Sequence, residues 1–129
     1  MIRIRSVVCQ ACGGRSRVRE GGGRGHYLLH CESCGRATTV FRDQVLDAHL
    51  RYLKGLPEEG RALSADYDRE RVESHPGEPI PLEAYWAAIE AAAGACACGG
   101  RFSLEAPPRC PNCRSADLED DPDGQTVYE

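Results

Sequence analysis

The chain has 129 residues, of which 30, or 23%, are large apolar side chains, and this is few for one wide core. Charged residues make up 28% of the chain, and it contains no run of 18 uncharged apolar residues, which excludes a transmembrane helix. The net charge of −4 is uneven, because residues 1–42 carry eight arginines against two glutamates while the remainder has a net charge of −10.

The first third of the chain is predicted to consist of strands and turns. Residues 2–8 alternate apolar and basic side chains, which is typical of a strand. The glycine-rich residues 21–25 are expected to form the tip of a hairpin. Residues 26–30 and 37–42 are then expected to be strands, since aromatic and branched residues supply their apolar content.

The middle of the chain is predicted to be helical. Asp43 is expected to cap a helix on which leucines recur at helical spacing up to Gly55. A short helix is expected across residues 66–73, with Ser64 as its cap. A further helix is expected from Pro81 to Gly94, because proline suits a first turn and glycine ends a helix.

The last third of the chain, like the first, is predicted to combine cysteine pairs with short strands. Residues 101–105 alternate apolar and charged side chains and are expected to form a strand. Residues 117–123 contain five acidic residues and no basic one, so they are expected to be a solvated loop or tail. Residues 125–128 are expected to form a final strand.

The eight cysteines are the most unusual feature of the sequence, and in so short a chain they exclude most large-pocket enzyme folds. They form four close pairs, and the residue after a pair is expected to need a positive φ, which glycine adopts at little cost. Glycine follows three of the pairs, whereas Arg114 follows the fourth. The first four-cysteine spacing lies in the range of a zinc site, and four thiolates around zinc close a structural tetrahedron. The expected metal ligands are Cys9, Cys12, Cys31, Cys34, Cys96, Cys98, Cys110 and Cys113.

Other interpretations of the cysteines remain open. Disulfides need an oxidising compartment, and the charged N-terminal residues do not form a signal-peptide core. A catalytic dithiol would need one reactive pair instead of four, and iron could replace zinc at the second site. His26 or His30 could also replace a cysteine as ligand, whereas His49 and His75 are expected to be ordinary surface residues.

The motifs Cys-Gln-Ala-Cys-Gly-Gly and Cys-Glu-Ser-Cys-Gly resemble the paired cysteine turns of zinc ribbons. Cys-Ala-Cys-Gly-Gly and Pro-Arg-Cys-Pro-Asn-Cys-Arg-Ser resemble a compact, rubredoxin-like version of the same unit. The resemblance implies an α+β protein with two small β units that bind one Zn²⁺ each, or two Zn²⁺ per chain. It implies an N-terminal ribbon at 1–42, a helical middle segment at 43–94 and a C-terminal ribbon with an acidic tail at 95–129.

Each zinc is expected to be shared by neighbouring cysteine pairs, with residues 21–25 and 101–109 folding their flanking pairs together. Closure entropy grows slowly with loop length, so it does not decide between neighbouring, nested and crossed pairings. The helix that contains Trp86 is expected to join the two ribbons, with Trp86 in the core. The alternative is a partly exposed Trp86 that anchors a protein partner.

An enzyme is not expected, since complete four-cysteine sets leave no open zinc position. The favoured function is that of a small zinc-binding accessory or adaptor protein that acts in the cytoplasm through a protein partner, without membrane association. The alternative is nucleic-acid binding through the basic N-terminal hairpin, since arginines at alternate strand positions share a face. The candidate phosphate contacts are Arg15, Arg17, Arg19 and Arg24.

Overall fold

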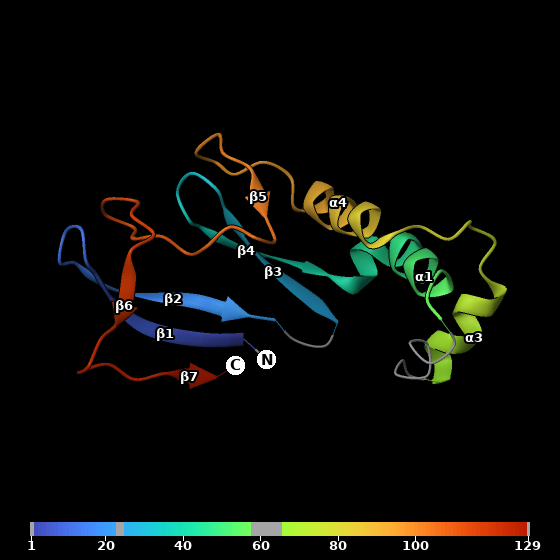
Figure 1. Cartoon of the computed structure of the whole chain (residues 1–129), viewed down its shortest axis with the longest axis horizontal. Coiled ribbons are helices and arrows are strands. Elements are labelled where there is room, and N and C mark those ends of the chain that lie inside the picture. The colour runs from blue at the N-terminus through green and yellow to red at the C-terminus, as the bar shows by residue number, and fades with distance from the viewer. Residues whose placement is uncertain (1, 23–24, 58–65, 129) are drawn as a thin grey trace. The chain divides into compact units, whose positions relative to one another are not determined.

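A computed structural model describes residues 2–22, 25–57 and 66–128 of the chain (Figure 1). Strands and helices are both present, so the expected α+β class is confirmed. Within the described ranges, no helix is long and apolar enough to cross a membrane.

The chain divides into two compact units. One unit contains Met1–Phe41 together with Ala93–Glu129, and the other contains Arg42–Ala92. All eight cysteines belong to the first unit, which is built from both ends of the chain, and the three helices of the described chain begin in the second.

The first sheet is organised around the N-terminal strand β1 (Ile2–Cys9) (Figure 1). One edge of β1 pairs with β2 (Arg15–Gly21), and the other pairs with β6 (Leu118–Asp120) and β7 (Val127–Tyr128), all antiparallel. The expected strand at 2–8 is therefore present, and the one expected at 125–128 is shorter than predicted, with only residues 127–128 in β7. Both β1 and β7 lie in this sheet.

The prediction that residues 117–123 are a solvated loop is wrong, because β6 lies within them. Some of the acidic side chains have basic partners: Asp120 Oδ1 lies 3.1 Å from Arg5 Nη1, and Asp121 Oδ2 lies 3.8 Å from Arg15 Nε. The backbone is also fixed, since Asp121 N donates to the Ser6 carbonyl oxygen over 3.0 Å. The acidic segment thus joins the sheet through its backbone, with arginines of β1 and β2 beside some of its carboxylates.

The second sheet has β3 (His26–Cys31) at its centre, between β4 (Ala37–Phe41) and β5 (Phe102–Ser103). Leu29 and Val40 are fully buried and form part of its apolar side. The strand expected at 101–105 is shorter than predicted, with only two residues in β5 and an isolated bridge at Arg101.

The strands that flank the glycine-rich residues 21–25 are not paired with each other, because β2 and β3 belong to different sheets. The expected hairpin between them is therefore wrong, and residues 23–24 themselves lie outside the described residues. The hairpin turns of the described chain are the cysteine turns themselves, which join β1 to β2 and β3 to β4. The prediction failed because both a Cys-x2-Cys turn and a glycine run can reverse the chain, and here the cysteine turns do so.

The second unit begins with the 3₁₀ turn η1 (Arg42–Val45), followed by α1 (Leu46–Lys54), α3 (Asp66–Ser74) and α4 (Leu82–Ala93). The predicted helices are therefore present, and the proposed cap Ser64 lies outside the described residues. Asp43 is not the cap of α1, because it lies inside η1 and the helix begins after Val45 with no side-chain cap.

Apolar side chains of α1 and α3 form a small core in this unit. Leu50, Leu53 and Val72 are buried in it, and Leu46 packs against them. His49 is also buried, with its Nδ1 3.1 Å from the Tyr85 hydroxyl, so its assignment to the surface is wrong.

His75 is half-buried and makes a specific contact. Its Nε2 lies 2.9 Å from Asp47 Oδ1. The ring therefore has a fixed carboxylate partner on α1 and is not the ordinary surface residue that was expected.

Trp86 is 40% exposed, so the prediction that it lies in the core is wrong. Its neighbours on α4 take the buried positions instead, with Tyr85 3% and Ile89 0% exposed. The expectation that this helix joins two ribbons is also wrong, since both cysteine-bearing ends form one unit through β1, β6 and β7.

This difference in burial predicts unequal stability losses. Ile89→Ala should lower the free energy of unfolding by about 2–5 kcal/mol, because it removes a fully buried side chain. Trp86→Ala should lower it by less than Ile89→Ala does, since Trp86 is already 40% exposed and its removal leaves a site open to water. Chemical denaturation followed by circular dichroism measures both values, and an equal loss in the two variants would contradict the described burial.

Candidate metal centres

Each cysteine pair lies in a tight turn with a repeated pattern of backbone hydrogen bonds. In the first turn, Cys9 N donates to the Gly14 carbonyl oxygen over 2.9 Å and Gly13 N donates to the Cys9 carbonyl oxygen over 2.8 Å. The turns at Cys31 and Cys110 repeat both bonds, and the turn at Cys96 is one residue shorter. We call each of these turns a cysteine knuckle. The backbone curls so that the two sulfurs of a knuckle face the same point.

The residue after each pair has a positive φ, as the sequence predicts. The values are +75° at Gly13, +77° at Gly35 and +90° at Gly99. Arg114 occupies the equivalent position with φ 66° and is the one non-glycine residue of the described chain with a positive φ. The fourth knuckle therefore keeps the turn geometry without glycine, which costs about 1–2 kcal/mol.

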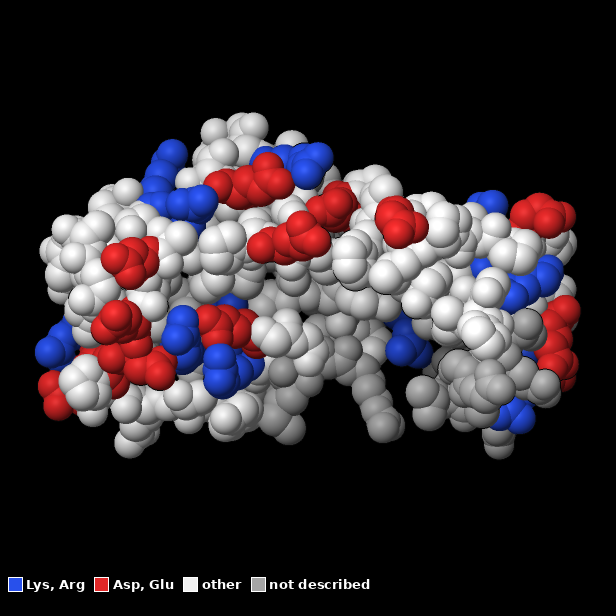
Figure 2. Space-filling model, viewed as in Figure 1, with Lys and Arg blue, Asp and Glu red and all other residues white. Residues whose placement is uncertain are grey.

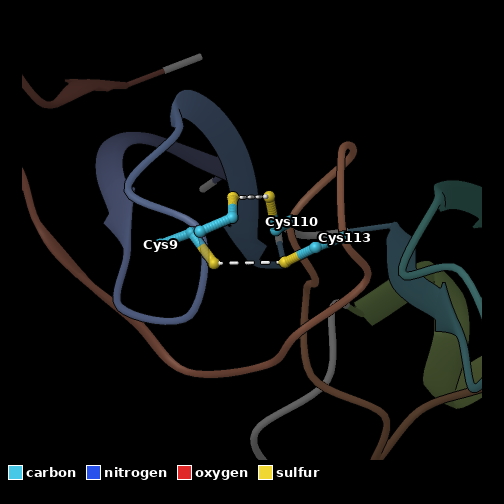
Figure 3. Close-up of side chains that lie close together, drawn as sticks. Cys9, Cys110 and Cys113 are labelled. Carbon is cyan, nitrogen blue, oxygen red and sulfur yellow. Dashed lines mark hydrogen bonds between the residues drawn. The ribbon is translucent and has the colours of Figure 1, made fainter.

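The knuckles combine as nested pairs. Cys9 and Cys12 meet Cys110 and Cys113, and within this quartet all four sulfurs lie within 4.8 Å of one another. Figure 3 shows the sulfurs of Cys9, Cys110 and Cys113 turned toward one another from opposite ends of the chain. The predicted sharing of each metal by neighbouring pairs is therefore wrong.

The second quartet is nested inside the first. It contains Cys31, Cys34, Cys96 and Cys98, also within 4.8 Å of one another. The second unit, Arg42–Ala92, is inserted between its two knuckles. The nested arrangement follows from the sheets, because β6 pairs with β1 beside the first knuckle and β5 pairs with β3 beside the second.

The sulfur spacing fits a tetrahedral metal ion. The cross-knuckle Sγ–Sγ distances are 3.5 Å for Cys9–Cys113 and 3.7 Å for Cys12–Cys110. They are 3.5 Å for Cys31–Cys98 and 3.6 Å for Cys34–Cys96. A zinc–sulfur bond of about 2.3 Å gives a tetrahedron edge of about 3.8 Å, whereas a disulfide requires about 2.05 Å. Both quartets therefore have the donor type, number and spacing of a four-cysteine metal site.

Backbone N–H groups point at the sulfurs and favour the thiolate form. Gly14, Ser33 and Gly100 each have a backbone nitrogen 3.4 Å from the sulfur two residues earlier in the chain. Such bonds stabilise the negative charge that a metal ligand must carry.

The pKa values of the thiols diverge within each quartet. Burial raises the pKa of Cys31, but the backbone N–H groups of Cys34 and Ser33 and the neighbouring thiols outweigh it and lower the pKa to about 6. The backbone N–H groups of Cys113 and Asn112 lower the pKa of Cys110 to about 7. In each quartet the first proton is therefore lost near neutral pH, which prepares the site for a cation.

Loss of further protons is opposed by the thiolates already present. The Gly100 N–H lowers the pKa of Cys98, but the neighbouring cysteines outweigh it and raise the pKa to about 11. The Ser115 N–H is similarly outweighed at Cys113, whose pKa is raised to about 12. Without a metal ion, four thiolates in one quartet repel one another, so full ionisation requires the cation.

The histidines near the quartets are not ligands. His30 Nε2 lies 2.8 Å from the Arg19 carbonyl oxygen and therefore donates to it, while burial lowers the pKa of the ring. The ring of His26 is tilted against that of Phe41 at a centroid distance of 6.3 Å. The quartets are complete with sulfur alone.

The comparison with protein families gives one match. A family described as "Domain of unknown function (DUF8255)" matches residues 5–119. The chain belongs to this family. The DUF8255 match spans both cysteine quartets and the helical segment between them, so the nested arrangement lies entirely within the family's domain. No curated protein and no solved structure matches the chain.

The arginines predicted to contact phosphate have different neighbours. Arg15 is near Asp121 and lies 3.6 Å from Asp123, whereas Arg17 and Arg19 lie farther along β2 on the same face. Arg24 lies outside the described residues. The predicted basic hairpin is therefore replaced by a strand whose arginines have different surroundings.

Glycines in equivalent knuckle positions should differ in their tolerance of alanine. A Cβ at Gly35 would lie 2.4 Å from Arg109 N, whereas a Cβ at Gly99 would meet nothing within 4 Å. Gly99→Ala should lower the free energy of unfolding of the protein by about 1–2 kcal/mol through φ alone. Gly35→Ala should lower it further, because Arg109 must move. Denaturant titration measures the difference, and equal losses would show that the close approach is absent.

Arg114→Gly should raise the stability of the zinc-loaded protein by about 1 kcal/mol, since glycine adopts the positive φ without strain. The gain is limited because glycine also gains freedom in the unfolded chain. Denaturant titration with a matched Arg101→Gly control, outside the knuckle turn, measures it. A loss of stability in Arg114→Gly would show that the left-handed conformation is not strained.

Proposed function

We propose that this chain is a small zinc-binding accessory protein in which two structural zinc ions hold the strand-rich unit together. The observation that carries the proposal is the pair of complete sulfur quartets, each with tetrahedral spacing. Zinc fits best, since four cysteine thiolates are its usual structural ligands. Four sulfurs fill the tetrahedron, so the proposal includes no catalytic step at either metal.

Elemental analysis of the purified protein tests the metal. We expect close to two zinc ions per chain. One metal ion per chain, or mostly iron, would contradict the two-zinc proposal.

We propose further that the protein acts through a protein partner, with Trp86 as the contact residue. The indole is 40% exposed on α4 although its neighbours Tyr85 and Ile89 are buried. Tryptophan is enriched among the residues that dominate protein interfaces, so an exposed indole on an ordered helix is a suitable anchor.

Affinity capture with the zinc-loaded chain as bait tests this function. The assay uses extract from the native host, with and without nuclease, at low and moderate salt. We expect a discrete protein that survives nuclease and is lost with Trp86→Ala. Tyr128→Ala, at an aromatic side chain that is 61% exposed in the other unit, is the matched control and should keep the partner. Equal capture by Trp86→Ala and the wild type would reject this contact.

Nucleic-acid binding is the second candidate, and the common face of Arg15, Arg17 and Arg19 on β2 favours it. Phosphate contacts of this kind are weak, tolerant of sequence and sensitive to salt. Capture that disappears on nuclease treatment, and charge reversal at these arginines that abolishes it, would favour this candidate over the adaptor.

A further inference from the structure

The strand-rich unit contains a cavity of about 400 Å³ that lies beside both metal quartets. Its walls come from β2, from the second knuckle and from the loop around the fourth knuckle. None of the described residues that line it is acidic. Five of its lining residues are arginines, namely Arg17, Arg19, Arg36, Arg109 and Arg114.

The other described arginines of this unit have carboxylate partners. Arg5 lies 2.8 Å from Glu20, Arg101 lies 3.1 Å from Glu32, and Arg3 also pairs with Glu20. Figure 2 shows the same general pattern, with basic and acidic side chains side by side on the face it presents. Pairing is thus the usual state of an arginine here.

The arginines of the cavity differ in this respect. Four of them form no ion pair with a carboxylate of the described ranges. These four are Arg17, Arg36, Arg109 and Arg114. Several guanidinium groups that share one cavity repel one another, and an anion in that cavity would relieve the repulsion.

Part of the cavity wall is fixed by the fold. Arg109 Nη1 donates to the Arg114 carbonyl oxygen over 3.0 Å, and the backbone of Arg109 packs closely against Gly35. On the opposite side, His30 ties the Arg19 carbonyl to β3. Arg109 Nε is buried and has no acceptor among the described residues, so a ligand oxygen could supply one. A site that is already ordered loses less entropy when it binds a ligand.

The arginines do not serve as hydrogen-bond donors to the thiolates. The donors to cysteine sulfur are backbone groups at Gly14, Ser33 and Gly100. Within the described chain, no guanidinium of the four unpaired arginines reaches a cysteine sulfur. A role in balancing the negative charge of the thiolates through hydrogen bonds therefore does not explain why these four arginines line the cavity.

The geometry points to a binding site for the phosphate group of a small phosphorylated ligand. The planar guanidinium fork matches phosphate oxygens in bidentate contacts, and several forks around one cavity surround a doubly charged group. A volume of about 400 Å³ lies in the range of small-molecule sites, and a concave site selects a compact ligand over an extended strand. This site goes beyond the proposed adaptor function and does not depend on it.

Titration calorimetry on the zinc-loaded full chain tests the site, with inorganic phosphate, adenosine monophosphate and a ten-nucleotide single strand as probes at about 0.15 M ionic strength. We expect phosphate and the mononucleotide to compete for one site per chain. Arg17→Gln and Arg36→Gln should each weaken binding by roughly tenfold or more, because each removes a charge-assisted contact. Arg101→Gln, at an exposed arginine outside the cavity, should bind as the wild type does.

Four results would overturn the proposal. One is the absence of phosphate and mononucleotide binding to the zinc-loaded wild type. Another is an equal loss of affinity in Arg101→Gln, which would indicate a general charge effect. The third is exclusive binding of the oligonucleotide, which would favour a nucleic-acid surface instead. Zinc content is measured for every variant, and zinc loss in Arg36→Gln without any phosphate effect would assign the arginines to the metal sites. Failure of the adaptor proposal would appear separately, in the capture assay with Trp86→Ala.

Discussion

Removal of the two proposed zinc ions should unfold the strand-rich unit. Structural zinc contributes about 10–16 kcal/mol per site in small peptides, whereas a whole domain has a net stability of about 5–15 kcal/mol. The apolar core of this unit is too small to replace that contribution, since β5 and β7 have only two residues each. Its buried apolar side chains other than cysteine are Ile2, Val7, Val18, Leu28, Leu29, Val40 and Phe102.

Amide hydrogen exchange before and after chelation measures this effect. Protection of the amides in β1 and β3 should fall to that of an unfolded chain, and zinc restored to the chelated protein should recover it. Chelator already saturated with zinc is the control, because it adds the same compound without removing zinc from the protein. Strands that remain protected in metal-free protein would show that the sheets do not depend on the quartets.

The local features of this fold could be predicted from the sequence. Cysteine spacing and glycine position identify the knuckles, and alternation identifies β1, because these signals depend on residues close together in the chain. The positive φ of Arg114 shows that backbone hydrogen bonds of the knuckle can impose the turn even where the side chain opposes it.

The pairing of the knuckles could not be predicted, because it depends on contacts between opposite ends of the chain. Residues 117–123 gave a signal of net negative charge, yet Arg5 and Arg15 are their partners across the sheet. The acidic residues predict a strand only when the arginines opposite them are known, and the sequence does not show which arginines these are. Two of the arginines that line the cavity, Arg17 and Arg19, were among the candidate phosphate contacts. The other three, Arg36, Arg109 and Arg114, were missed, because their place beside β2 also depends on contacts between distant parts of the chain.

The nested pairing should appear directly in the metal content of variants that lack two knuckles. When serine replaces the cysteines of the first and fourth knuckles, the inner quartet stays complete, so one zinc per chain is expected. When serine replaces those of the first and second knuckles, two cysteines of each quartet remain, so tight zinc binding should be lost at both sites. Pairing between neighbours predicts the opposite pattern, because it leaves the last four cysteines intact in the second variant. Elemental analysis after exhaustive dialysis measures the content of each.

A second measurement does not require any variant to fold. Exchange of both zinc ions for ¹¹³Cd allows each metal resonance to be correlated with the cysteine β-protons that couple to it. We expect one resonance to correlate with Cys9, Cys12, Cys110 and Cys113, and the other with the remaining four. A resonance shared by Cys9 and Cys31 would contradict the nested quartets and, with them, the β1–β6 pairing that places the fourth knuckle beside the first.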